Sequence, residues 1–257
     1  MSDDPIDRDA TGRTGRPAVP RLLTVLGKVL FGLAVFSGTV GGWAAMQHRA
    51  AMHEPLPDAG GRQGACVVWF VGSSSFYRWT GIAHDMRPWS VRNRGVGGAL
   101  LPELRQRFAN EGPVTPPQAI VFYAGDNDIA AGMSAADAER GFGEFVAAKM
   151  AKMPRVPLIA LSIKPSPTRW AQRPAQQAYD RAVARLATVT PALTYADASA
   201  GLLVDGRPGP FFVDDGVHLN PDGYRVWSAA IHAALGRALP AAVVDRCTRQ
   251  SAGAHRL

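Results

Sequence analysis

Beyond residue 64, short apolar runs alternate along the chain with longer amphipathic stretches. The apolar runs have the length of strands and predict strands at Cys66–Val71, Ser90–Asn93, Ala119–Ala124, Leu158–Ser162 and Leu193–Ala196. The stretches between them predict helices at Phe76–Asp85, Pro102–Ala109, Ala135–Met153, Ala175–Thr188 and Pro221–Leu239. Short apolar strands separated by helices are typical of a parallel sheet that is covered on both faces. The pattern therefore predicts a doubly wound α/β domain.

A different pattern precedes this domain. Between Leu22 and Met46 the only charged residue is Lys28, and Val29–Met46 is an uncharged run that would form a helix about 27 Å long. The run is more uniformly apolar than an amphipathic core helix should be, which favours a transmembrane signal-anchor. A cleaved secretory signal remains the alternative, because Gly42-Trp43-Ala44 places small residues where a signal peptidase reads them.

Basic residues are distributed unequally around this apolar segment. Only Arg49 and Arg62 follow it within twenty residues, whereas five basic residues precede or begin it. These five are Arg8, Arg13, Arg16, Arg21 and Lys28. The positive-inside bias predicts a cytoplasmic N-terminus and an α/β domain on the extracytoplasmic side, periplasmic or on the outer face. Cleavage of the segment would instead give a secreted protein.

The chain is accordingly divided into five parts. We expect a disordered cytoplasmic tail at 1–21, a transmembrane signal-anchor at 22–46, a linker at 47–64, the α/β domain at 65–240 and a C-terminal tail at 241–257. The two cysteines, Cys66 and Cys247, bracket the domain. In an oxidising compartment they could pair and tie the C-terminal tail to the first strand, while two free buried thiols are the equal alternative.

Composition narrows the classes of function. With 47% hydrophobic and 19% charged residues, the 257-residue chain can bury a sizeable core, which excludes a wholly disordered protein. The formal net charge of +7 comes from scattered basic residues without interleaved aromatics, so we expect a solvated basic surface and no nucleic-acid partner. Two cysteines without a Cys/His cluster exclude a structural zinc site, so we expect catalysis without a bound metal or other cofactor.

Two motifs follow the first two predicted strands. Gly72-Ser73-Ser74-Ser75 ends the first strand, and a serine at such a strand-to-helix turn can present its hydroxyl above the sheet as a nucleophile. Taken alone, an N-cap is the more common use of this pattern. Residues 93–98, Asn-Arg-Gly-Val-Gly-Gly, follow the second strand and free the backbone to approach a ligand, with a tight turn as the alternative.

Two further motifs follow later in the chain. Gly125-Asp126-Asn127-Asp128 comes after the third strand, where Asn127 is a suitable neutral oxyanion donor, although turns also favour Asn and Asp. Asp215 precedes His218 by three residues and can bind the imidazole Nδ1–H, which leaves Nε2 free as a base. A helix-capping Asp beside a surface His is the alternative. All four motifs lie at loops that can meet at one edge of the sheet.

This ordered set of motifs resembles the SGNH (GDSL-like) hydrolase superfamily over about Cys66 to Leu239. The matching blocks are 72–75, 93–98, 125–128 and 215–219, and the last, Asp-Gly-Val-His-Leu, is the strongest single piece. The resemblance implies a three-layer α/β/α sandwich with a five-stranded parallel sheet of flavodoxin-like type. In this sequence that sandwich would follow the N-terminal transmembrane helix.

Residue by residue, the resemblance implies Ser74 as nucleophile and Asp215 and His218 as its triad partners. Gly98 and Asn127 would form the oxyanion hole together with the backbone N–H of Ser74. The sequence departs from the commonest family motif at one plain point, because Ser73 stands where that motif has Asp.

The function implied by the resemblance is a serine esterase acting on carboxylic (O-acyl, including O-acetyl) esters of small molecules or polysaccharides. An acyltransferase acting on envelope polysaccharide uses the same residues and is one alternative. A non-catalytic carbohydrate- or lipid-binding module of the same fold is another. We also expect the segment 164–170 to shape the substrate site, with Lys164 or Arg169 as candidates for binding an anionic group.

Overall fold

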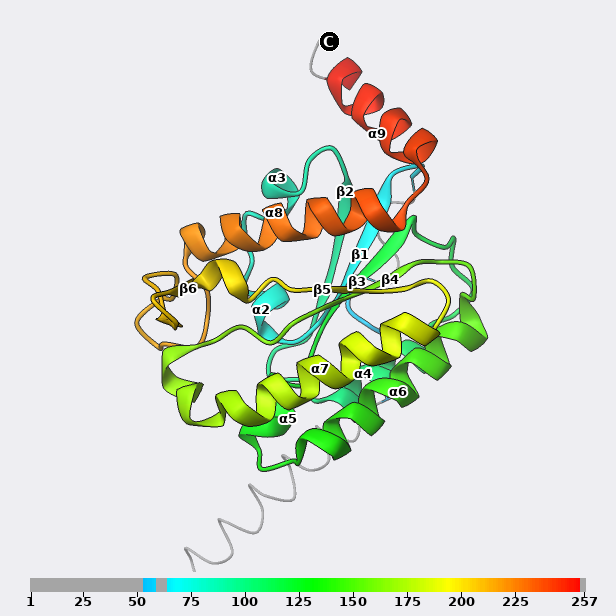
Figure 1. The fold of residues 1–257 in the computed structure, drawn as a ribbon. Coiled ribbons are helices and arrows are strands. Elements are labelled where there is room, and N and C mark those ends of the chain that lie inside the picture. The colour runs from blue at the N-terminus through cyan, green and yellow to red at the C-terminus, as the bar shows by residue number, and fades with distance from the viewer. Residues whose placement is uncertain (1–52, 59–63, 255–257) are drawn as a thin grey trace, which may run out of the picture. The chain divides into compact units, whose positions relative to one another are not determined.

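A computed structural model describes residues 53–58 and 64–254, and its centre is a five-stranded parallel sheet (Figure 1). The strands are β1 (Val67–Gly72), β2 (Ser90–Gly95), β3 (Ala119–Tyr123), β4 (Leu158–Leu161) and β5 (Leu193–Ala196). They are ordered β2-β1-β3-β4-β5, and all neighbouring pairs run parallel. The predicted fold class of the α/β domain, with five parallel strands between helices, is thereby confirmed.

Helices cover both faces of the sheet. Figure 1 shows α8 with α2 and α3 on one face, and α4, α6 and α7 on the other. The α-helices that pack on the sheet or at its ends are α2 (Ser74–Tyr77), α3 (Ile82–Asp85), α4 (Leu101–Ala109), α5 (Asp126–Ala130), α6 (Ala135–Lys152), α7 (Arg173–Val189) and α8 (Pro221–Ala238). The shorter elements are the 3-10 helices η1 (Pro167–Gln172) and η2 (Ala200–Leu202) and the hairpin strands β6 (Leu203–Val204) and β7 (Arg207–Pro208).

Strand β1 shows why the predicted strands are apolar throughout. All six of its residues are buried, and successive side chains enter different cores because they point to opposite faces of the sheet. Trp69 and Val71 pack in the core beneath α4 and α6. Val68 and Phe70 pack in the core beneath α2 and α8. A strand that is covered on both faces has no solvent-facing position, so it carries no polar alternation.

Two short segments differ from the predicted helices. The stretch predicted as one helix from Phe76 to Asp85 is divided into α2 and α3. The division falls at Trp79-Thr80-Gly81, an aromatic, a β-branched residue and a glycine, all of which favour the helix less than alanine does. Helix α5 was not predicted, because its Asp-Asn-Asp sequence is equally typical of a turn.

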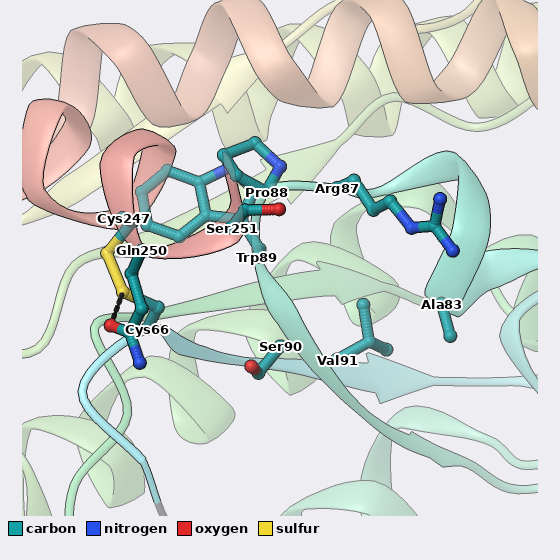
Figure 2. Close-up of a pocket in the computed structure, with 10 residues that line it drawn as sticks. All are labelled: Cys66, Ala83, Arg87, Pro88, Trp89, Ser90, Val91, Cys247, Gln250 and Ser251. Carbon is teal, nitrogen blue, oxygen red and sulfur yellow. Dashed lines mark hydrogen bonds between the residues drawn. A yellow bond between two sulfur atoms is a disulfide. The ribbon is translucent and has the colours of Figure 1, made fainter. Parts of the chain in front are cut away.

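The C-terminal segment, predicted as a tail over 241–257, forms the helix α9 at Ala241–Ala254. Val243 and Val244 pack against the core, and Cys247 is buried in a disulfide with Cys66 at the start of β1. Figure 2 shows this disulfide at the edge of a cavity of about 320 Å³, where Gln250 Oε1 lies 3.4 Å from Cys66 Sγ. The disulfide therefore holds α9 to the first strand.

Part of the predicted linker packs onto the domain. Leu56 is buried in the core, and its backbone N–H donates to Glu111 Oε1 at 2.8 Å. The predicted cytoplasmic tail at 1–21 and the predicted transmembrane segment at 22–46 lie outside the described residues. Within 53–58 and 64–254, no helix is both long and apolar enough to cross a membrane.

Removal of the disulfide should destabilise the fold. The bridge joins residues 181 apart in sequence, and the chain-entropy model gives a stabilisation of about 5 kcal/mol for a loop of this length. We expect Cys247→Ala to lower the free energy of unfolding by several kcal/mol in urea titrations. The control is Thr248→Ala, on the exposed side of α9, and an unchanged unfolding midpoint for Cys247→Ala would contradict the expectation.

Candidate active site

Ser74 lies just past the carboxyl end of β1, at the start of α2. The turn is fixed by the backbone N–H of Ser73, which donates to Tyr123 O of the neighbouring strand at 3.1 Å. Ser73 and Ser75 are buried, whereas Ser74 is partly exposed. Of the three adjacent serines, the structure therefore places Ser74 where its hydroxyl can meet a ligand.

His218 and Asp215 meet Ser74 from the loop before α8. His218 Nε2 lies 2.8 Å from Ser74 Oγ, and His218 Nδ1 lies 2.6 Å from Asp215 Oδ2. The other carboxylate oxygen, Asp215 Oδ1, accepts from the backbone N–H groups of Val217 and His218, both at 2.8 Å. The carboxylate thus turns back onto the imidazole as the three-residue spacing predicts. In this arrangement Nδ1 donates to Asp215 and Nε2 faces the hydroxyl.

The loop that carries these residues is held from two sides. Asn220 caps α8, its side chain accepting from Gly223 N at 2.9 Å. The η1 turn contacts the other side, because Thr168 Oγ1 donates to Asp215 O at 2.8 Å and Thr168 N donates to Gly216 O at 3.1 Å. Gly216 has a φ of +62°, and a Cβ there would lie 2.4 Å from Thr168 Oγ1. The close approach of η1 therefore requires glycine at this position.

The environment of Asp215 keeps its carboxylate charged. Partial burial works to raise its pKa, but the two backbone N–H donors and the His218 imidazole hold the pKa well below its usual range. Arg78 adds an ion pair of 3.3 Å to Oδ2, although its side chain is 55% exposed, so solvent weakens that pair. Among residues 53–58 and 64–254, no cluster of three or more His, Cys, Asp or Glu side chains could hold a metal ion.

The two predicted oxyanion residues lie in the loops after β2 and β3, the strands that flank β1. Gly98 is exposed with a φ of +72°, and nothing lies within 4 Å of where its Cβ would be. Asn127 is in the first turn of α5, and its Nδ2 donates to Ala99 O at 3.1 Å. This hydrogen bond joins the segments that follow β2 and β3. Both segments lie at the carboxyl ends of the strands, as Ser74 does.

A buried ionic cluster that the sequence does not predict lies beneath Asn127. Asp126 Oδ2 lies 2.7 Å from Lys164 Nζ and 2.9 Å from a terminal nitrogen of Arg169, while Tyr123 and Gln176 also donate to this carboxylate. Burial works to raise the pKa of Asp126, but the two cations outweigh it and hold the pKa below its usual value.

Lys164 is 1% exposed, and its ammonium group forms an ion pair with Asp126. The expectation that Lys164 binds an anionic substrate is therefore wrong. Two cations following the fourth strand, and an Asp directly before Asn127, were the signal in the sequence for this cluster. Their partnership depends on the meeting of the segments that follow β3 and β4, which no local pattern specifies.

Neutralising Asp126 should destabilise the protein, because Lys164 would remain buried without its carboxylate. Removing one partner of a buried pair typically costs about 3–5 kcal/mol, so we expect Asp126→Asn to lower the free energy of unfolding by that order. Glu144→Gln is the control, since it removes an ion pair to Arg105 in which both side chains are about half exposed. Equal losses in the two variants, measured by urea unfolding, would show that the buried cluster does not stabilise the fold.

Several solved structures share the fold of this chain. A protein described as a putative platelet activating factor from Streptococcus pneumonia is 17% identical with a TM-score of 0.63, covering 79% of this chain and 99% of that one. A GDSL-like lipase from Bacteroides thetaiotaomicron is 23% identical with a TM-score of 0.56, covering 71% and 95%. A carbohydrate esterase family 3 protein from Talaromyces cellulolyticus is 21% identical with a TM-score of 0.53, covering 70% and 98%.

The sequence itself gives the family. No curated protein matches the chain. The family described as GDSL-like Lipase/Acylhydrolase matches residues 59–226, a range that contains all four motifs and extends from before β1 into α8. The chain therefore belongs to the GDSL-like lipase/acylhydrolase family and is an enzyme that hydrolyses esters.

Proposed function

We propose that this protein is a serine esterase that cleaves carboxylic O-acyl esters, O-acetyl esters among them, with Ser74 as nucleophile, His218 as base and Asp215 as the group that orients the base. The observation that carries the proposal is the continuous pair of hydrogen bonds, 2.8 Å from Ser74 Oγ to His218 Nε2 and 2.6 Å from His218 Nδ1 to Asp215. A nucleophile bonded to a base that is itself oriented by a third group is the arrangement that activates a hydroxyl.

The first step forms an acyl-enzyme. Ser74 Oγ attacks the acyl carbonyl carbon while its proton moves to His218 Nε2, and the carbonyl oxygen becomes an oxyanion. The imidazolium that forms is stabilised by the Asp215 carboxylate, whose lowered pKa keeps it ionised. The C–O bond of the ester then breaks, and His218 returns the proton to the leaving alcohol.

The second step releases the acid. Water takes the place of the alcohol, His218 Nε2 accepts its proton, and the hydroxide oxygen bonds to the acyl carbon. Collapse of the second oxyanion breaks the bond to Ser74 Oγ, which recovers the proton from His218. In both steps the oxyanion is bound by the backbone N–H groups of Ser74 and Gly98 and by Asn127 Nδ2–H, donors that need no protonation.

The proposed substrates are O-acetylated carbohydrates and small acyl esters. Support comes from the fold shared with the carbohydrate esterase family 3 protein and with a structure described as an acetyl esterase mutant, which is 20% identical with a TM-score of 0.53. An acyl transfer to a sugar hydroxyl would use the same acyl-enzyme, with the sugar oxygen in place of water in the second step.

The test is p-nitrophenyl acetate hydrolysis by the full-length chain. We expect Ser74→Ala to lower kcat by on the order of 10⁴- to 10⁶-fold, and Asn127→Ala by about 10²- to 10³-fold, because one oxyanion donor is lost. Ser75→Ala is the matched control on the same helix, since its buried hydroxyl has no hydrogen-bond partner among the described residues.

The outcomes separate the candidate functions. Turnover that survives Ser74→Ala would refute the nucleophile, and a wild-type chain without turnover would indicate a binding module. Slow hydrolysis that an added acceptor sugar accelerates would identify a transferase. A panel of acetyl, butyryl, long-acyl and acetylated-sugar esters, assayed with the wild type, then defines the acyl group.

We further propose that residues 22–46 anchor the chain in a membrane with the catalytic domain on the extracytoplasmic side. The apolar run and the basic residues before it support this orientation, and the disulfide between Cys66 and Cys247 is of a kind that persists in oxidising compartments.

Membrane extraction tests the anchor. We expect the full-length chain to remain in the membrane fraction after a carbonate wash and its catalytic domain to be cut by protease added to spheroplasts. A soluble protein whose N-terminus lies just after Ala44 would show instead that the segment is a cleaved signal. Protection of the domain from added protease would reverse the proposed orientation.

A further inference from the structure

The side chain of Asn127 is held at both ends of its amide. Its Oδ1 accepts from a terminal guanidinium nitrogen of Arg169 at 3.0 Å, and its Nδ2 donates to Ala99 O at 3.1 Å. A flipped amide would place NH₂ against the guanidinium and Oδ1 against a carbonyl oxygen, so both contacts select the same orientation. An amide nitrogen carries two hydrogens, and this orientation leaves the second one for a substrate oxygen.

Arg169 is itself held by the loop that contacts the base. Its backbone N–H donates to Ser166 O at 3.2 Å within η1. The neighbouring residue, Thr168, bonds the backbone of Asp215 and Gly216. The η1 turn thus contacts the loop of His218 through Thr168 and the side chain of Asn127 through Arg169. The position of this one turn therefore affects both His218 and Asn127.

Neutralisation of Asp126 does not require Arg169. Lys164 Nζ lies 2.7 Å from the Asp126 carboxylate and is 1% exposed, which already gives this carboxylate a buried cation. The side chain of Arg169 is 20% exposed, and the same guanidinium nitrogen reaches both Asp126 Oδ2 and Asn127 Oδ1. Arg169 is thus a second cation against one carboxylate, and its guanidinium lies directly on the oxygen of the Asn127 amide.

We propose that Arg169 is a positioning residue of the esterase reaction, which fixes the Asn127 amide and strengthens its remaining Nδ2–H as a donor to the oxyanion. A cation on Oδ1 draws electron density from the amide and makes the N–H more acidic, which strengthens its bond to an anionic acceptor. The benefit is greatest when the carbonyl oxygen carries a full charge, so it is realised in the transition state more than in the ground state. The inference rests on the proposed function, because it assigns Asn127 to the oxyanion hole.

A double-mutant cycle on the full-length chain tests this assignment. We expect Arg169→Met to lower kcat for p-nitrophenyl acetate by about 10- to 100-fold, part of the loss for a whole oxyanion donor, with KM changed less than about threefold. In the Asn127→Ala background the same substitution should lower kcat less than about threefold, because the group through which Arg169 acts is absent. Arg169→Lys, which keeps the charge, should recover roughly tenfold of the loss.

The matched control is Arg140→Met, which removes the same charge from an exposed position on α6 and should leave kcat unchanged. Equal losses from Arg169→Met with and without Asn127 would overturn the inference, as would a raised KM with an unchanged kcat. Thermal unfolding identifies any variant that fails to fold. If Arg169→Met fails to fold, the cycle is repeated with Arg169→Lys, and equal losses of kcat with and without Asn127 would again overturn the inference. Wild-type turnover that does not depend on Ser74 would instead refute the proposed function, so the two failures are distinguishable.

Discussion

A carboxylate that is almost completely withdrawn from water has to be matched by cations, and at Asp126 this requirement organises the active edge of the sheet. The carboxylate follows β3, Lys164 follows β4, and Arg169 lies in the turn beyond it. Because an unpaired charge in such a position costs several kcal/mol, the pairing of Asp126 with Lys164 holds the segments that follow β3 and β4 together. Their meeting brings η1 against Asn127 on one side and against the loop of Asp215 on the other.

The Asp126 cluster does not bring Ser74 and His218 together, and the sheet topology does. Ser74 and His218 are 144 residues apart in sequence, yet β1 lies between β2 and β3, and α8 covers the same face of the sheet as α2. Tyr224 in the first turns of α8 donates to Ser75 O at 2.9 Å, which joins the helix that follows the His218 loop to the helix that begins with Ser74. Distant parts of the chain therefore meet at the carboxyl end of β1, as expected where strand order reverses in a doubly wound sheet.

Much of this arrangement could be predicted from the sequence because its signals are local. The five strands are buried on both faces, so each appears as an apolar run, and observed and predicted ends differ by at most two residues. The pairing of Asp215 with His218 is also local, since three residues allow the side chain to turn back.

Helix α9 was missed because three apolar residues, Val243, Val244 and Cys247, give only a short stripe. The contact of Arg169 with Asn127 was beyond sequence reasoning, because it depends on the burial of Lys164 and on side-chain directions from separate loops.

Burial also decides which of the two arginines near the site, Arg78 or Arg169, has the stronger electrostatic effect. Arg78 pairs with Asp215, but the two side chains are 55% and 39% exposed, and a pair so open to solvent contributes about 0–1 kcal/mol. Arg169 is 20% exposed and faces a carboxylate that is 2% exposed, so its field is screened less. The less hydrated cation lies on the amide that is proposed to face the oxyanion, where charge appears during the reaction. The more exposed cation lies on a carboxylate that stays charged throughout, where an added positive charge changes little between ground state and transition state.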